Sequence, residues 1–170
     1  RKKEEGEQYY DGSSIASPVT NNATICIALT IMLLGGMAAR VLDVRGAFLN
    51  GRFEDGESLY MKVPEGMEHH YENDDVLKLK RPIYGLKQGA MCFWWDLLCA
   101  MKSMGHERSK ADPCLYFSWV TGVLVMWLSW IDDNLCISKP EQVESEAKKL
   151  AERYDVDDLG AMEEYVGCKT

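Results

Sequence analysis

Two adjacent aspartates, Asp132 and Asp133, stand in one of the least polar parts of the chain. The apolar run "VLVMWLSWI" precedes them and "NLCIS" follows, so two strand-like segments would place the doublet at the tip of a tight hairpin. Half-burying two carboxylates this close together is costly unless cations neutralise them. The alternative is a plain hairpin turn, because Asp and Asn favour turns for conformational reasons alone.

Asp43 is a third isolated acid, and it favours the chemical interpretation. It comes at the end of "ARVLDV", a stretch that predicts a short buried strand over residues 39–44. Three acids at the ends of adjacent strands would offer the hard oxygen ligands that Mg²⁺ prefers. Two such ions, about 3.5–4 Å apart, suit in-line phosphoryl transfer. Because successive strand residues point to opposite faces, we expect Asp132 to be the closer partner of Asp43 and Asp133 the more peripheral one.

The other acidic pairs and the histidine pair are expected to be solvated. Each acidic pair lies among polar residues or turn signals, at Asp74-Asp75, Asp157-Asp158 and Glu163-Glu164. His69 and His70 are neighbours in the polar segment "EGMEHHYENDD", where adjacent histidines are more often solvated than bound to a metal.

The elements that would position these residues mix strands and helices without strict alternation. Capping residues before an apolar run predict a buried helix over residues 21–34, and a terminal glycine closes a second helix predicted over residues 87–105. A third helix follows Ser138, which would form a capping box with Glu141. Strands are predicted in "SLYMKVP" and "VLKLK" and at residues 114–120, 123–131 and 134–138. The expected fold is α+β, an antiparallel sheet with helices packed on one face.

Charge and cysteine content exclude several classes of protein. A net charge of −8 and a pI near 4.9 argue against a broad basic face. Any surface that binds nucleic acid must therefore be local or belong to another part of the protein. The six cysteines show neither zinc-ligand spacing nor a disulfide pattern. The uncharged runs at 23–39 and 115–131 only reach the lower length limit of a membrane span and contain glycine or turn signals. They are interpreted as core, and no membrane partner is expected.

Six motifs occur in an order that points to one family. They are "LDVRGAFLNG" (42–51), "LYMKVPEGM" (59–67), "IYGLKQGAMCFW" (83–94), "ADPCLYF" (111–117), "WIDDNL" (130–135) and "DLGAMEEYVG" (158–167). Together they closely resemble the reverse transcriptase of copia-type LTR retrotransposons, over roughly residues 10–170. Several ordered motifs are far more specific than any single one.

The resemblance implies RNA- and DNA-templated DNA synthesis on a right-hand polymerase fold. The chain would be a single reverse-transcriptase domain fragment, with residues 1–20 a remnant of the fingers and residues 21–170 a palm-like core. Most of the fingers, the thumb and ribonuclease H would be absent. Asp43 would be the first metal-binding catalytic aspartate, and Asp132 with Asp133 the catalytic, metal-binding pair of the family's aspartate box.

The same resemblance implies a nucleotide-binding set. Val44, Phe48, Tyr84 and Gly85 would contact the incoming nucleotide. Phe48, five residues after Asp43, would act as an aromatic gate, because a rigid ring under the sugar admits deoxyribose and collides with the 2′-hydroxyl of ribose. Gly85 would permit close approach of the backbone.

Template or primer contacts are assigned to Lys87, Gln88 and Trp130. Trp130 stands where the aspartate box usually has tyrosine, so the aromatic body is kept and a hydroxyl is lost. For "YGLKQ" (84–88), a simple glycine turn before a core helix is the alternative interpretation.

The implied cofactors are two Mg²⁺ ions, with Mn²⁺ as a substitute. The implied partners are an RNA or DNA template with its primer, deoxynucleoside triphosphates, and the remaining Pol segments: fingers, thumb and ribonuclease H. The implied location is the cytoplasm, in a virus-like particle, with nuclear entry. A second hypothesis is a catalytically inactive, truncated palm-like scaffold that binds protein or nucleic acid.

Overall fold

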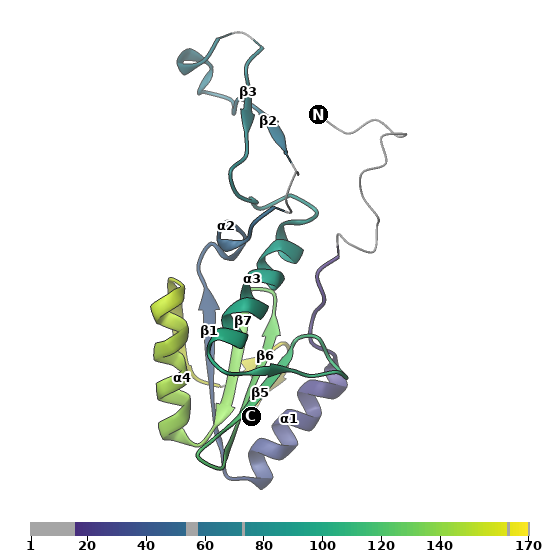
Figure 1. Cartoon of the computed structure of the whole chain (residues 1–170), viewed down its shortest axis with the longest axis vertical. Coiled ribbons are helices and arrows are strands. Elements are labelled where there is room, and N and C mark those ends of the chain that lie inside the picture. Colours follow the sequence, from purple (N-terminus) through teal and green to yellow (C-terminus); the bar gives the residue numbers. More distant parts are fainter. Residues whose placement is uncertain (1–15, 54–57, 73, 163, 170) are drawn as a thin grey trace.

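The computed structural model describes residues 16–53, 58–72, 74–162 and 164–169 (Figure 1). Helices and strands follow one another without strict alternation, as expected. In chain order they are α1 (Asn22–Leu34), β1 (Ala38–Val44), α2 (Ala47–Asn50), β2 (Tyr60–Lys62), the 3-10 helix η2 (Glu68–His70), β3 (Val76–Lys78), α3 (Gly89–Ser103), β4 (Glu107–Arg108), β5 (Leu115–Val120), β6 (Val123–Trp130), β7 (Asp133–Ser138), α4 (Pro140–Arg153), β8 (Val156–Ala161), β9 (Glu164–Tyr165) and β10 (Cys168–Lys169).

A six-stranded sheet in the order β4-β5-β6-β7-β1-β8 forms the centre of the molecule. Each neighbouring pair in it is antiparallel. Strand β1 lies between β7 and β8, so the end of β1 is flanked by one strand on each side. The strands predicted near residues 39–44, 114–120, 123–131 and 134–138 are confirmed, with ends that differ by a residue or two.

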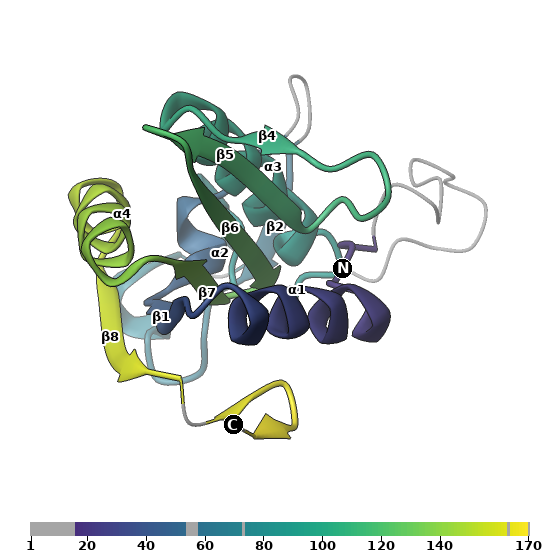
Figure 2. The same ribbon diagram turned by 90° about the horizontal axis from the view of Figure 1, so that it is seen from below.

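Helices cover both faces of this sheet (Figure 2). Helices α3 and α4 pack on one face, over a core that includes Leu42, Trp127 and Cys136. Helix α1 packs on the opposite face, against Leu128 and Leu135 among others. The prediction of an α+β fold with an antiparallel sheet is confirmed, but the placement of all helices on one face is corrected by α1. In β7 the adjacent residues Leu135 and Cys136 are both fully buried, as a strand covered on both faces requires.

Helix α1 is only half covered. Ile25, Ala28 and Met32 are buried, whereas Leu33 and Leu34 are 73% and 86% exposed. The expectation of a buried helix is therefore wrong for its outer side, because an apolar residue on every side of the helix does not indicate which side faces the core. No helix within the described ranges is long and apolar enough to cross a membrane.

The helix caps only partly follow the predictions. The Asn21 side chain accepts a hydrogen bond from Ala23 N, 2.8 Å away, and caps α1 as expected. The predicted capping box of α4 does not form. Ser138 Oγ instead donates to the Leu124 carbonyl across the β6–β7 hairpin, and Lys139 occupies the cap position.

Strands β2 and β3 form a separate two-stranded arm that rises beyond the end of the sheet (Figure 1). Both strands were predicted from their alternation, which the structure preserves: outer residues are exposed and Met61 and Leu77 are half-buried. The arm leaves the domain after α2 and returns just before α3.

Candidate active site

The Asp132-Asp133 doublet lies at the β6–β7 hairpin, as predicted. Trp130 pairs with Asp133 across the hairpin, which leaves Ile131 and Asp132 as its two turn residues. Ile131 has a φ of +57°, a left-handed conformation that is unfavourable for a β-branched residue. The paired strands on both sides hold this turn in place.

Two hydrogen bonds to the Asp132 carbonyl fix the turn, and one of them joins it to the end of β1. The Asp132 carbonyl accepts one from Val44 N at 3.0 Å and one from Asn134 Nδ2 at 2.8 Å. Asp132 is thereby fixed beside the strand end that carries Asp43.

The three predicted aspartates lie at this corner of the sheet. Asp43 and Asp133 are direct partners in the β1–β7 ladder, so the two side chains start from the same face. Burial raises the pKa of Asp43, and the charge of Asp132 raises it further. Burial also raises the pKa of Asp133, followed by the charges of Asp132 and Asp43. Asp132 is thus the aspartate whose charge acts most strongly on Asp43, although Asp133 is its partner in register.

The donor chemistry of this corner fits Mg²⁺. All three side chains offer hard carboxylate oxygens, and within the described ranges none of them forms an ion pair with a lysine, arginine or histidine. Asp43 and Asp132 would hold the metal, with Asp133 beside them. In the part of the chain that the structure describes, no three His, Cys, Asp or Glu side chains are grouped closely enough to hold a metal ion.

A fourth acid, Asp157, was missed by the sequence analysis. It is the partner of Asp43 in the β1–β8 ladder, on the side away from Asp133. Arg45 Nε donates to Asp157 Oδ2 at 2.6 Å, and a second bond joins Arg45 Nη2 to Asp157 Oδ1. Asp158 pairs with Arg40 at 3.1 Å. Both side chains stay solvated as expected, at 44% and 43% exposed, but each also forms an ion pair. No local signal in the sequence shows that a strand would pair this doublet with β1.

Two aromatic rings border the aspartates. Phe48 lies on the short helix α2, and its ring centroid is 4.3 Å from that of Tyr84. The Tyr84 hydroxyl donates to Asp132 Oδ2 at 3.5 Å. Burial and the charge of Asp132 raise the pKa of Tyr84, which keeps this hydroxyl protonated and able to donate. Gly89, the first residue of α3, lies close to the Phe48 ring, since a Cβ there would be 3.3 Å from it, tighter than most contacts.

The remaining predicted residues lie around this group in different environments. Gly85 has a φ of +90°, which a glycine adopts without strain. Lys87 is exposed and Gln88 is half-buried, directly before α3. Trp130 is half-buried against the core cluster on the α1 face. Val44 is only 1% exposed, beneath α3 and α4, so its side chain is not available to a ligand, and its backbone N–H donates to the Asp132 carbonyl.

Comparison with known proteins agrees with this geometry. Residues 2–170 match the family model described as reverse transcriptase (RNA-dependent DNA polymerase). The chain belongs to the reverse transcriptase family. The retrovirus-related Pol polyprotein from transposon TNT 1-94 of Nicotiana tabacum is 32% identical to this reverse transcriptase domain over 161 residues, which is 94% of this chain and 12% of the polyprotein.

Further relatives come from plants and yeast. The Pol polyprotein from transposon RE1 of Arabidopsis thaliana is 28% identical over 94% of this chain and 11% of its own length. The transposon Ty1-DR5 Gag-Pol polyprotein of Saccharomyces cerevisiae is 25% identical over 76% of this chain and 7% of its own length. The chain therefore spans a small part of each relative. No solved structure matches the domain. The predicted resemblance to copia-type retrotransposon reverse transcriptases is confirmed.

Proposed function

We propose that the chain is the catalytic core of an RNA-directed DNA polymerase, which transfers a nucleotide from a deoxynucleoside triphosphate to a primer 3′-hydroxyl. The observation that carries this proposal is the pairing of Asp43 with the Asp132-Asp133 hairpin at one corner of the sheet. Carboxylates that repel one another and have no cationic partner in the described part of the chain suit a divalent cation.

Asp43 and Asp132 would hold two Mg²⁺ ions, or Mn²⁺ in their place, and Asp133 would lie at the edge of the site. When bound, such ions stabilise the attacking and leaving oxygens of an in-line displacement. The Tyr84 hydroxyl orients the Asp132 carboxylate through its hydrogen bond. The backbone bond between Val44 and Asp132 keeps the turn aligned with β1.

Phe48 would select the sugar of the incoming nucleotide. Its ring is held between Tyr84 and the start of α3, so it has little freedom to move away from a 2′-hydroxyl. Gly85 would let the backbone approach the nucleotide, and Lys87 and Gln88 would contact the template from the start of α3.

The nucleic-acid partners would be an RNA or DNA template and its primer. The relatives are polyproteins, so the other Pol segments would supply most of the basic surface that an acidic domain of net charge −8 lacks.

Primer extension by the complete Pol region tests this proposal. We expect Asp132→Asn to abolish synthesis with Mg²⁺ or Mn²⁺, while Asp74→Asn, which removes the same charge at an exposed turn far along the arm, leaves synthesis intact. Equal synthesis by the wild type and Asp132→Asn would contradict the assignment.

A non-catalytic palm-like scaffold is the second candidate. It is favoured by one observation: among the described residues no three acids are grouped to hold a metal. The same assay separates the two functions, because a scaffold would show no Mg²⁺-dependent synthesis by the wild type in the complete Pol region.

A further inference from the structure

The β2–β3 arm has one face that is rich in lysine. Tyr60 pairs with Lys78 and Lys62 pairs with Val76, and all four side chains are exposed. A further backbone bond from Leu79 N to the Leu59 carbonyl, 2.8 Å long, extends the ladder by one step. Lys80, two residues beyond Lys78 and just past the end of β3, is also exposed. We call this surface, made of Tyr60, Lys62, Val76, Lys78 and Lys80, the basic face of the arm.

Charge is unevenly distributed along the arm. The basic face contains three lysines and no carboxylate, and within the described ranges none of these lysines forms an ion pair. Among the described residues of the arm, the acids are instead gathered at its tip, at Glu65, Glu68, Glu72, Asp74 and Asp75; three further acids, Glu54, Asp55 and Glu57, precede β2 in the sequence and lie outside the described residues. A polyanion would therefore be attracted to the basic face and repelled at the tip.

Both ends of the arm join the domain next to residues of the candidate active site. The chain enters the arm after α2, which carries Phe48, and leaves it before Tyr84. Arg81 Nη1 donates to the Gly51 carbonyl at 3.0 Å and so ties the returning strand to the end of α2. A strand of nucleic acid that reaches the aspartates from this end would pass the arm.

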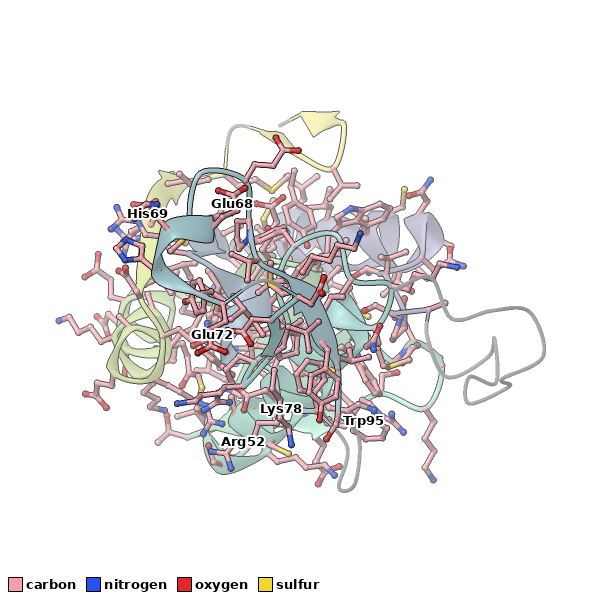
Figure 3. The ribbon with its side chains drawn as sticks, turned by 90° about the horizontal axis from the view of Figure 1, so that it is seen from above. Arg52, Glu68, His69, Glu72, Lys78 and Trp95 are labelled. Atoms are coloured by element: carbon pink, nitrogen blue, oxygen red, sulfur yellow. The ribbon has the colours of Figure 1, made fainter. Side chains whose placement is uncertain are left out.

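Exposed aromatic rings occur on the arm and on helix α3. Arg52, Lys78 and Trp95 lie toward one side of the molecule, and Glu68 and His69 lie toward another (Figure 3). Trp95 is 50% exposed and Tyr60 is 54% exposed. Exposed rings beside lysines are the combination that single-stranded nucleic acid recognises, because unpaired bases stack on the rings and phosphates meet the cations.

We propose that the basic face of the arm binds the unpaired template strand next to the active site. Lys62, Lys78 and Lys80 contact phosphates, and Tyr60 stacks on an unpaired base. The template role rests on the proposed polymerase function, whereas the binding of a single strand does not. The net charge of the domain is −8 and repels nucleic acid, so binding requires a local basic surface of this kind.

Fluorescence anisotropy with the 170-residue chain and a labelled single-stranded 20-mer, as RNA and as DNA, tests the proposal over a series of KCl concentrations. The test variant is Lys62→Gln, Lys78→Gln and Lys80→Gln combined. The matched control removes three exposed lysines elsewhere, with Lys102→Gln, Lys110→Gln and Lys148→Gln combined. Both triple variants change the net charge equally, and neither changes a buried residue.

The arm variant is expected to bind at least tenfold more weakly, and its plot of log affinity against log salt should lose a slope of about 2, at about 0.7 for each phosphate contact. Tyr60→Ala should weaken binding about tenfold and leave the salt slope unchanged. Equal losses in the arm and control variants, or no binding by the wild type, would overturn the proposal. Equal affinity for a duplex of the same length would overturn the preference for an unpaired strand.

The result is separable from the polymerase assignment. Asp132→Asn should bind the 20-mer as the wild type does, whatever its effect on synthesis. If the arm variant loses binding and Asp132→Asn still polymerises, the arm proposal stands and the catalytic assignment fails.

Discussion

Asp157 lies directly opposite Asp43 in the β1–β8 ladder, as Asp133 does in the β1–β7 ladder. Three acids thus form a row across three strands, but only Asp157 is paired, through two hydrogen bonds with Arg45. Asp157 raises the pKa of Asp43 and Arg45 lowers it. The Arg45–Asp157 pair therefore influences the charge state of Asp43 without belonging to the aspartate group itself.

The first prediction concerns the pH dependence of synthesis. Asp43 must be ionised to bind a metal. Arg45→Met removes the charge that lowers the pKa of Asp43 and leaves Asp157 unpaired beside it, so the acid limb of the pH–rate profile should move to higher pH. Asp157→Asn should move it to lower pH, because an acid is lost and Arg45 remains. Primer-extension rates measured across the acid range check both directions, and superimposable profiles for the two variants would contradict the assigned role of the pair.

Sugar selection by Phe48 is the second prediction. Phe48→Ala removes the ring that is held between Tyr84 and α3, so incorporation of ribonucleotides relative to deoxyribonucleotides should rise at least tenfold. Leu49→Ala is the matched control, since Leu49 is the next residue and is 53% exposed. The ratio of kcat/KM for the two nucleotides measures the effect, and an unchanged ratio in Phe48→Ala would exclude the gate.

Stability should depend on the buried carboxylate of Glu146 on helix α4. Glu146 is almost fully buried, with its Oε2 2.7 Å from His106 Nε2 and its Oε1 2.6 Å from Lys149 Nζ. Removing a buried charge from its hydrogen-bond partners costs about 2 kcal/mol, so Glu146→Gln should lower the free energy of unfolding by about that amount at pH 7. Glu144→Gln, an exposed change on the same helix, should have little effect.

Titration of the Glu146 carboxyl also makes the free energy of unfolding depend on pH. Burial alone would raise the pKa of Glu146, but the hydrogen bonds from His106 and Lys149 outweigh it and lower the pKa in the folded chain. A lowered folded pKa means that the stabilisation is complete above the unfolded pKa and is lost as pH falls through the folded one. Urea unfolding should therefore show the wild type and Glu146→Gln converging at low pH; a constant difference would contradict this.

Gly51 tests the packing of α2 on α3. A Cβ at this position would lie 2.8 Å from the Cys92 backbone carbon and Cβ, closer than normal contacts allow. Gly51→Ala should thus move α2, which carries Phe48, and lower the free energy of unfolding by about 1–3 kcal/mol. Urea unfolding measures the loss of stability. A variant as stable as the wild type would contradict tight packing between Gly51 and α3.

Much of the fold was predictable from periodicity. The runs that became β5, β6 and β7 alternate or stay apolar between clear turn residues, and the apolar face of α4 at Val143, Ala147 and Leu150 is buried as expected. The side of the sheet that α1 covers was not predictable, because an uncharged helix has no polar side to point toward solvent.

The active site was predictable only in part. Asp43 and the Asp132-Asp133 doublet stand out because each follows an apolar strand, and the strand register does bring them together. Asp157 does not stand out, since it sits among other acids and reaches Asp43 only through the pairing of β8 with β1. Long-range register of this kind leaves no local pattern in the sequence.

The most direct test compares Asp43→Asn with Asp157→Asn in single-nucleotide primer extension by the complete Pol region with Mg²⁺. Both variants remove one carboxylate from the same row of the sheet, so they differ only in the role assigned to each acid. We predict that Asp43→Asn slows incorporation about a thousandfold, equivalent to about 4 kcal/mol, while Asp157→Asn at neutral pH stays within about threefold of the wild type. Similar rates for the two variants would contradict a metal-binding role for Asp43 and with it the polymerase assignment.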